Sequence, residues 1–212
     1  MDQIMQKNKT LFDEIEKVEK CLGGPRKAYH IEKKTRLFVD QVLRFVTEQF
    51  NTQSTPQIYI DMEVELRLFQ EVIKPDYQLM RSAKFLQDNN PYEEPEMTQD
   101  IPVYAIEVKR TDDRATDVTK GLEQHMRQLR HLCIQHGLEE MYGIYTNYRS
   151  WYFTRYDLHN ETLQKVTKDD NLDLFEVSQK FDILDKRDLS LKKEVLCQVT
   201  SILEWLIILG MK

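Results

Sequence analysis

Residues 103–110, VYAIEVKR, constrain the fold of this chain more than any other segment. The run is mostly apolar and rich in β-branched residues, which is typical of a strand inside a sheet. Side chains alternate along a strand, so Glu107 and Lys109 are expected on the same face as Val103 and Ala105. Burying a charged group costs several kcal/mol unless another group compensates it. The segment therefore predicts a buried strand whose acid and amine are retained for chemistry.

The periodicity on either side of this strand predicts an α/β fold. Apolar and polar residues alternate over residues 57–69, and residues 73–80 predict a second strand that is entered through Pro75. Apolar residues at helical spacing follow at 118–136, and a hairpin is expected at 141–157. A strand, a helix and a strand in succession indicate a crossover between parallel strands of a mixed sheet.

Helical segments precede and follow this core. Helical spacing of apolar residues predicts helices up to about residue 22, from about 29 to 50, and from about 190 onward. We expect one α/β domain with a mixed central sheet flanked by helices, with a core at about 29–157 and helical additions at 1–24 and 175–212. The terminal helices are candidates for a homodimer contact or for assembly with another protein.

Composition restricts the environment and the partners of the chain. The 212 residues carry a net charge of −6, which is unfavourable for a non-specific nucleic-acid binder but leaves room for a local basic surface. Much of the acid lies in residues 88–96 and 168–176. We find neither a signal peptide nor a membrane-spanning run, so we expect a soluble intracellular protein, cytoplasmic or nuclear. Three scattered cysteines predict reduced core thiols without a disulfide framework.

Two carboxylates are candidates for a metal site. Asp76 stands at the start of the strand that precedes Glu107, and the two side chains converge if those strands are neighbours. Carboxylates at close range repel each other unless a cation lies between them. Mg²⁺, or Mn²⁺ in its place, takes one or two carboxylates, keeps waters and accepts phosphate oxygens. Lys109 is then suited to orient a water and to offset charge in a phosphoryl transition state.

The sequence Pro75-Asp76, followed by Glu107-Val108-Lys109, resembles the signature of the PD-(D/E)XK nuclease superfamily. The resemblance is to the nuclease domains of type I restriction-enzyme R subunits and to Crinkler-type and transposon-linked nucleases. It implies a restriction-endonuclease-like core around one Mg²⁺-dependent site, and hydrolysis of phosphodiester bonds by a metal-activated water. The matching positions outside the signature are Glu32, Thr35, Arg36, Asp40, Gln128, Thr146 and Asn147, with the hairpin at 149–157.

The resemblance assigns roles to individual residues. It implies that Asp76, Glu107, Lys109 and Gln128 are catalytic, and that Glu32 joins Asp76 and Glu107 as a metal ligand, directly or through water. The residues predicted to bind nucleic acid are Arg36, Arg110, Tyr148, Arg149 and Trp151.

Several of these residues have an alternative structural role. Glu32 is also suited to pair with Arg36 one helical turn later, which stabilises a helix by a few tenths of a kcal/mol. The aromatic residues of the hairpin, Tyr148 and Trp151, are also suited to pack against the core. Gln128 is also suited to an exposed position on its helix.

Three functions remain open at this stage. The first is a metal-dependent endo- or exonuclease, with DNA favoured over RNA as the substrate. The second is a catalytically silent fold of the same kind, acting as a nucleic-acid-binding or assembly subunit of a larger complex. The third is a cap-snatching endonuclease that acts on RNA, for which His30 is the one histidine near the first acid.

Overall fold

The computed structural model describes most of the chain. It covers residues 2–23, 32–51, 58–62, 66–68, 71–82, 100–109, 115–158, 175–185 and 187–210. Arg110, His30 and the acidic segment 88–96 lie outside the described residues.

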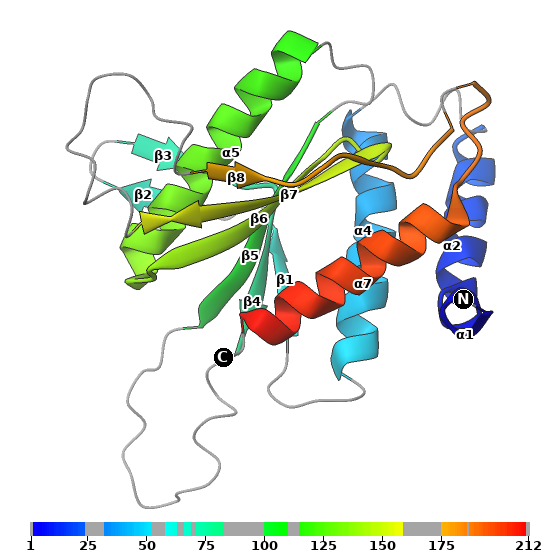
Figure 1. The fold of residues 1–212 in the computed structure, drawn as a ribbon, viewed down its shortest axis with the longest axis horizontal. Helices are drawn as coiled ribbons and strands as arrows, with labels where there is room; N and C mark the ends of the chain where they lie inside the picture. Colours follow the sequence, from blue (N-terminus) through cyan, green and yellow to red (C-terminus); the bar gives the residue numbers. More distant parts are fainter. Residues whose placement is uncertain are drawn as a thin grey trace, which may run out of the picture.

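A seven-stranded mixed sheet forms the centre of the fold (Figure 1). β5 (Ile101–Val108) and β6 (Glu140–Thr146) run parallel, and helix α5 (Ala115–His136) crosses between them. The antiparallel strands are β1 (Ile58–Met62), β4 (Tyr77–Arg81), β7 (Ser150–Asp157), β8 (Phe175–Val177) and β9 (Phe181–Asp182). The strand order is β1-β4-β5-β6-β7-β8, and β9 also pairs with β7. The parallel crossover confirms the predicted α/β fold with a mixed sheet.

Helices cover both faces of this sheet (Figure 1). Besides α5 they are α1 (Asp2–Lys7), α2 (Lys9–Cys21), α4 (Glu32–Asn51) and α7 (Lys193–Leu209). α5 lies over a small apolar core that includes Ala105 and Leu129. α4 and α7 lie over a larger core that includes Phe38 and Leu203. α2 packs against α4, and α1 packs against α7.

The alternation of β5 between the two cores holds except at one residue. Ala105 belongs to the core under α5, whereas Tyr104 and Ile106 belong to the core under α4 and α7. Val103 was expected beside Ala105, but it belongs to the larger core. The reason is a register shift in the pairing of β4 with β5, where Tyr104 pairs with Leu79 and the next pair is Pro102 with Met80. Such a bulge locally breaks the two-residue alternation.

Each of the two strands predicted before β5 is divided. Residues 57–69 hold β1 and also β2 (Leu66–Leu68), which pairs with β3 (Glu71–Ile73) in a separate two-stranded sheet. The predicted strand 73–80 is cut between β3 and β4, because Pro75 has no N–H for a ladder. Alternation predicted extended backbone here, but it carried no information about which strand pairs with which.

The two ends of the chain also depart from the expectation in detail. The predicted first helix is split at Asn8, whose side-chain amide and backbone N–H both donate to the Ile4 carbonyl oxygen, at 2.9 and 3.1 Å. The C-terminal addition is not only helical, because β8 and β9 extend the central sheet. All three cysteines are free, with Cys133 and Cys197 buried; Cys21 is exposed and is not a core thiol. Among the described residues, no helix is long and apolar enough to cross a membrane.

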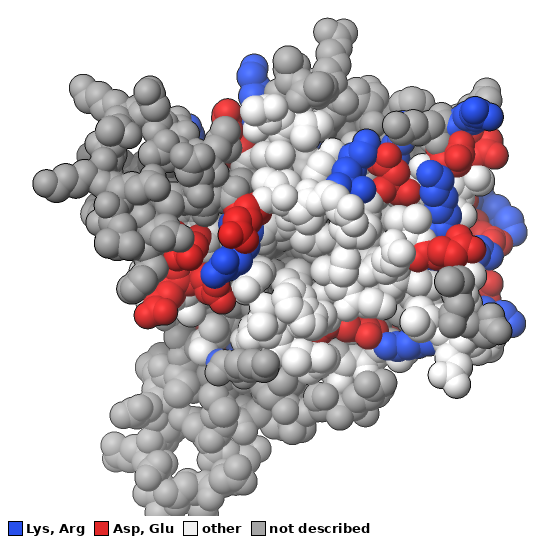
Figure 2. All heavy atoms as spheres, in the orientation of Figure 1, with Lys and Arg blue, Asp and Glu red and all other residues white. Residues whose placement is uncertain are grey.

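Charged side chains of both signs alternate on the face seen in Figure 2. One group lies over the ends of β6, β7 and β8, where Arg155 donates to Glu140 at 2.7 Å and lies 3.6 Å from Glu176. The described part of this face therefore presents mixed charges and no broad basic patch.

Candidate active site

The pairing of β4 with β5 brings Asp76 and Glu107 together. Tyr77 pairs with Ile106, so the residue before β4 lies opposite the next residue of β5. The backbone N–H of Val108 donates to Asp76 Oδ2 at 2.6 Å. Asp76 is 7% exposed and Glu107 is 2% exposed. The convergence predicted from the sequence is thus present, and both carboxylates are buried.

Each carboxylate has a cationic neighbour. Arg36 of α4 pairs with Asp76, and Lys109 pairs with Glu107. The pKa of Asp76 is nevertheless raised to about 6, first because it is buried and then because of the negative charge of Glu107. The Val108 N–H, Arg36 and Lys109 act in the opposite direction, in that order. The carboxyl group therefore titrates closer to neutral pH than an ordinary aspartate does, as is common at functional sites.

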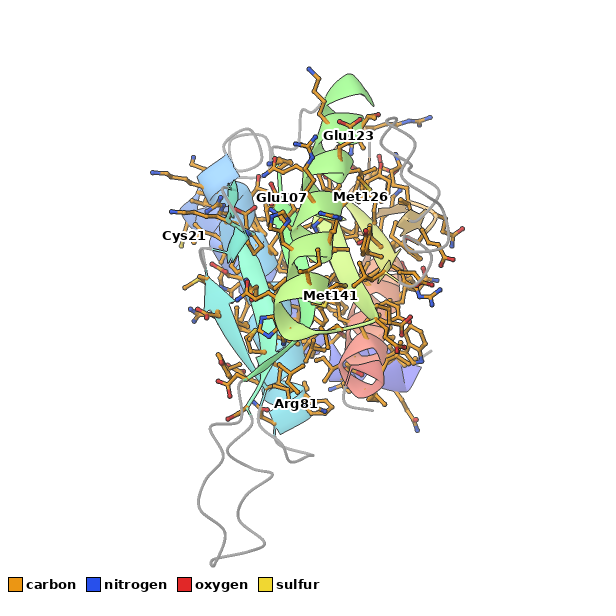
Figure 3. All side chains as sticks on the ribbon, turned by 90° about the vertical axis from the view of Figure 1, so that its left-hand side faces the viewer. Cys21, Arg81, Glu107, Glu123, Met126 and Met141 are labelled. Carbon is orange, nitrogen blue, oxygen red and sulfur yellow. The ribbon has the colours of Figure 1, made fainter. Side chains whose placement is uncertain are left out.

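Helix α5 contributes two amides to the site, one to Glu107 and one to Lys109. Gln128 is fully buried, and its Nε2 donates to Glu107 Oε2 at 2.6 Å and to the Lys74 carbonyl oxygen at 3.3 Å. Gln124 Oε1 accepts a hydrogen bond from Lys109 Nζ at 3.2 Å. Figure 3 shows Glu107 next to the part of α5 that carries Glu123 and Met126. Gln128 was predicted as a site residue, whereas Gln124 was not.

A second residue that the sequence analysis missed is His125. Its side chain is fully buried under α5, with Nδ1 at 3.1 Å from Gln128 Oε1 and Nε2 at 3.1 Å from Thr154 Oγ1. Burial lowers its pKa to about 4, and Lys109 adds to that effect, while the hydrogen bond to Gln128 opposes it. The signal was its position three residues before Gln128, which places both side chains on one helix face.

Several predicted site residues lie elsewhere. Tyr148 and Trp151 are fully buried, so they cannot offer a platform to a nucleic-acid strand, and that prediction is wrong. The Tyr148 ring stacks on Phe38 at 4.7 Å, because the hairpin turn packs onto α4. Arg149 is half-buried beside them. Arg36, predicted to bind nucleic acid, lies in the site itself, where it pairs with Asp76.

Two further predictions are not addressed by the described residues. Glu32 is the first residue of α4, but its side chain lies outside the described part. Arg110 follows β5 and also lies outside it.

The two carboxylates fit a hard divalent cation. Each of their four oxygens has one hydrogen-bond or ion-pair donor: Arg36, the Val108 N–H, Lys109 and Gln128. An ionised carboxylate offers about four acceptor sites, so each group keeps capacity for a further ligand. Within the described ranges, no group of three His, Cys, Asp or Glu residues could hold a metal. An ion such as Mg²⁺ needs only one or two carboxylates and keeps several waters, so Asp76 and Glu107 could hold one by themselves.

No protein-family model matches this chain, and a search of curated proteins returned no match either. Membership of the nuclease superfamily therefore stays a prediction from the residues named in the sequence analysis.

Proposed function

We propose that the protein is a Mg²⁺- or Mn²⁺-dependent nuclease of the PD-(D/E)XK type that hydrolyses phosphodiester bonds, with DNA favoured over RNA. One observation carries the proposal: Asp76, Glu107 and Lys109 converge from β4 and β5 under a helix that supplies Gln128. Two buried acids beside an amine are costly to fold, and a divalent ion and a phosphate would offset that cost.

Each side chain has a distinct part in this proposal. Asp76 and Glu107 would hold the ion, which would polarise a phosphate oxygen and lower the pKa of a bound water. Lys109 remains partly exposed, with 26% of its side chain accessible, and can reach a phosphate at the rim of the site. Its ammonium group offsets negative charge that develops in the transition state. Gln128 of α5 restrains the orientation of Glu107 through a hydrogen bond.

A cleavage assay tests the proposal directly. Single- and double-stranded DNA and RNA are incubated with the protein in Mg²⁺ or Mn²⁺, beside Lys109→Ala. We expect cleavage by the wild type and its loss in Lys109→Ala, because the lysine acts on the transition state. Lys17→Ala is the matched control, since Lys17 forms a surface ion pair with Glu14 on α2.

Calorimetry with Mn²⁺ separates metal binding from chemistry. We expect Lys109→Ala to bind the ion and Asp76→Ala to lose binding. Cleavage by Lys109→Ala at the wild-type rate would overturn the mechanism, and unchanged Mn²⁺ binding by Asp76→Ala would overturn the site.

A catalytically silent subunit is the second candidate, and the ion pairs favour it. Arg36 and Lys109 already balance both carboxylates, so the acids are compatible with the fold without a metal. Such a protein would bind nucleic acid or a partner protein and cleave nothing. Absence of cleavage on all four substrates, together with absence of Mn²⁺ binding, would favour this function over the nuclease.

The terminal helices support a contact with a second copy or with another protein. Trp205 and Ile208 of α7 are 54% and 52% exposed, and Ile4 of α1 is 47% exposed. Ile4 also lines a cavity of about 550 Å³, together with Met5, Phe181 and residues of α7. Exposed aromatic and aliphatic residues beside a cavity are typical of protein contacts. In the proposed role the protein acts inside the cell, in the cytoplasm or the nucleus, where nucleic acid is found.

A further inference from the structure

A chain of four buried polar side chains runs from the sheet through α5 to the acids. Thr154 of β7 contacts His125, His125 contacts Gln128, and Gln128 contacts Glu107. None of the four is more than 3% exposed. We infer that His125 and Thr154 are positioning residues, which hold the Gln128 amide so that its NH₂ group faces Glu107. The effect of this positioning on metal binding rests on the proposed function.

The partners of Gln128 allow only one direction for these hydrogen bonds. Its amide nitrogen lies against the Glu107 carboxylate and the Lys74 carbonyl oxygen, and both of these groups only accept. The amide oxygen therefore faces His125, and it also only accepts. His125 must then carry its proton on Nδ1, which leaves Nε2 of the neutral ring as an acceptor for the Thr154 hydroxyl. The low pKa of the buried ring keeps it in this neutral form at neutral pH.

A glycine in the central sheet leaves room for these buried polar side chains. Gly143 of β6 is the cross-strand partner of Thr154, and a Cβ atom there would lie 2.7 Å from Thr154 Oγ1 and 2.8 Å from His125 Cε1. Both distances are below normal van der Waals contact, so any side chain at this position would push the histidine away from the threonine. This steric requirement is independent of the hydrogen-bond pattern, and it points to the same pair of residues.

Both oxygens of Glu107 are held, one by Gln128 and the other by Lys109. Gln128 donates to Oε2, and Lys109 donates to Oε1, so the plane of the carboxylate is defined from two sides. Residues that orient a metal ligand without touching the metal typically change its affinity about 10- to 100-fold when they are removed. We therefore expect His125 to influence Mn²⁺ affinity entirely through Gln128.

A double-mutant cycle tests this dependence with the dissociation constant for Mn²⁺ as the readout. We expect His125→Phe to weaken binding about 10- to 100-fold, and to have no further effect in a Gln128→Leu background. His125→Asn, which keeps an N–H donor near the position of Nδ1, should recover most of the affinity. An equal loss from His125→Phe in both backgrounds would overturn the inference, because the histidine would then act independently of Gln128.

Thr154→Val provides a second variant if His125→Phe does not fold. Valine has nearly the shape of threonine and suits a strand, but it removes the donor to Nε2. We expect a loss of Mn²⁺ affinity in the same direction as for His125→Phe, and smaller. Wild-type affinity in a folded Thr154→Val protein would overturn the role of the threonine.

A measurement on the unliganded protein separates this inference from the proposed function. The imidazole nitrogen shifts of His125 in ¹⁵N-labelled wild-type protein report which nitrogen carries the proton. At about pH 7 we expect a neutral ring that is protonated on Nδ1. A ring protonated on Nε2, or a charged ring, would overturn the inference even if the protein binds Mn²⁺. If the protein binds no Mn²⁺ but shows the Nδ1–H ring, the metal proposal fails and the positioning chain stands.

Discussion

Asp76 and Glu107 each lie beside a cationic side chain, so these four charges balance inside the site. Arg36 pairs with Asp76, and Lys109 pairs with Glu107. Removing one partner of a buried ion pair leaves an uncompensated charge and typically costs about 3–5 kcal/mol. Substitutions at these four positions therefore change stability as well as chemistry, and each activity assay needs an unfolding measurement beside it.

The raised pKa of Asp76 predicts a specific pH dependence of stability. A carboxyl group with a pKa of about 6 in the folded protein and 3.8 as its ordinary value binds its proton more tightly when folded. Its contribution is fully present below the lower value and is lost as pH rises through the higher one. We expect the free energy of unfolding of the wild type, relative to Asp76→Asn, to fall by about 2 kcal/mol between about pH 4 and pH 7.

Urea unfolding of both proteins across this pH range measures the difference. The asparagine variant has a similar shape and no titration, so it removes the effect of all other carboxylates from the comparison. A difference that rises with pH would mean that the ion pair with Arg36 outweighs burial, and it would contradict the prediction.

At the scale of elements, the β6–β7 hairpin is held by aromatic packing on α4. Trp151 is fully buried, and its Nε1 donates to the Tyr148 carbonyl oxygen at 2.7 Å. Tyr148 has a positive φ of 65°, an uncommon conformation for a bulky residue, and its ring stacks on Phe38. The hairpin turn is thus a structural anchor that places β6 and β7, and with them Thr154, against α5.

Trp151→Ala is expected to lower the free energy of unfolding by about 3–5 kcal/mol, because it removes a large side chain from a packed core. Arg149→Ala, two residues away and half-buried, should change it by less than about 1 kcal/mol. Denaturant unfolding followed by circular dichroism provides both values. A small effect of Trp151→Ala on stability, combined with a large loss of single-stranded nucleic-acid binding, would restore the platform interpretation.

At the scale of the whole molecule, charge and exposed apolar surface suggest different partners. The net charge is −6, and the described part of the face in Figure 2 carries charges of both signs. Long-range attraction of nucleic acid is therefore weak, and binding would depend on contacts at the site itself. The exposed apolar residues of α1 and α7 instead favour a protein partner.

We expect the wild type to form a dimer, and Trp205→Lys combined with Ile208→Lys to give a monomer of 25.5 kDa. Charges at these exposed positions should oppose self-association without disturbing the core. Sedimentation velocity over a concentration series measures the assembly state. Met62→Lys is the matched control, since Met62 of β1 is 59% exposed and lies outside the terminal helices. A monomeric wild type at all concentrations would contradict the dimer and leave a different protein as the partner.

Much of the fold was determined by local patterns in the sequence. Alternation predicted β5 and the hairpin, helical spacing predicted α4, α5 and α7, and their order predicted the parallel crossover. These patterns depend on residues within a few positions of one another, so they are visible without a structure. The partners of the strands were not visible in the same way. Strand alternation does not distinguish the central sheet from the small sheet of β2 and β3.

In the candidate site, too, local sequence patterns predicted some contacts and not others. The proximity of Asp76, Glu107 and Lys109 followed from alternation along β5 and from a single assumption, that the two strands are neighbours. The pairing of Arg36 with Asp76, forty residues apart, and the contact of His125 with Thr154 were decided only by the tertiary structure. Such contacts depend on how α4 and α5 dock on the sheet. That docking is set by the packing of whole faces, and no short segment of the sequence encodes it.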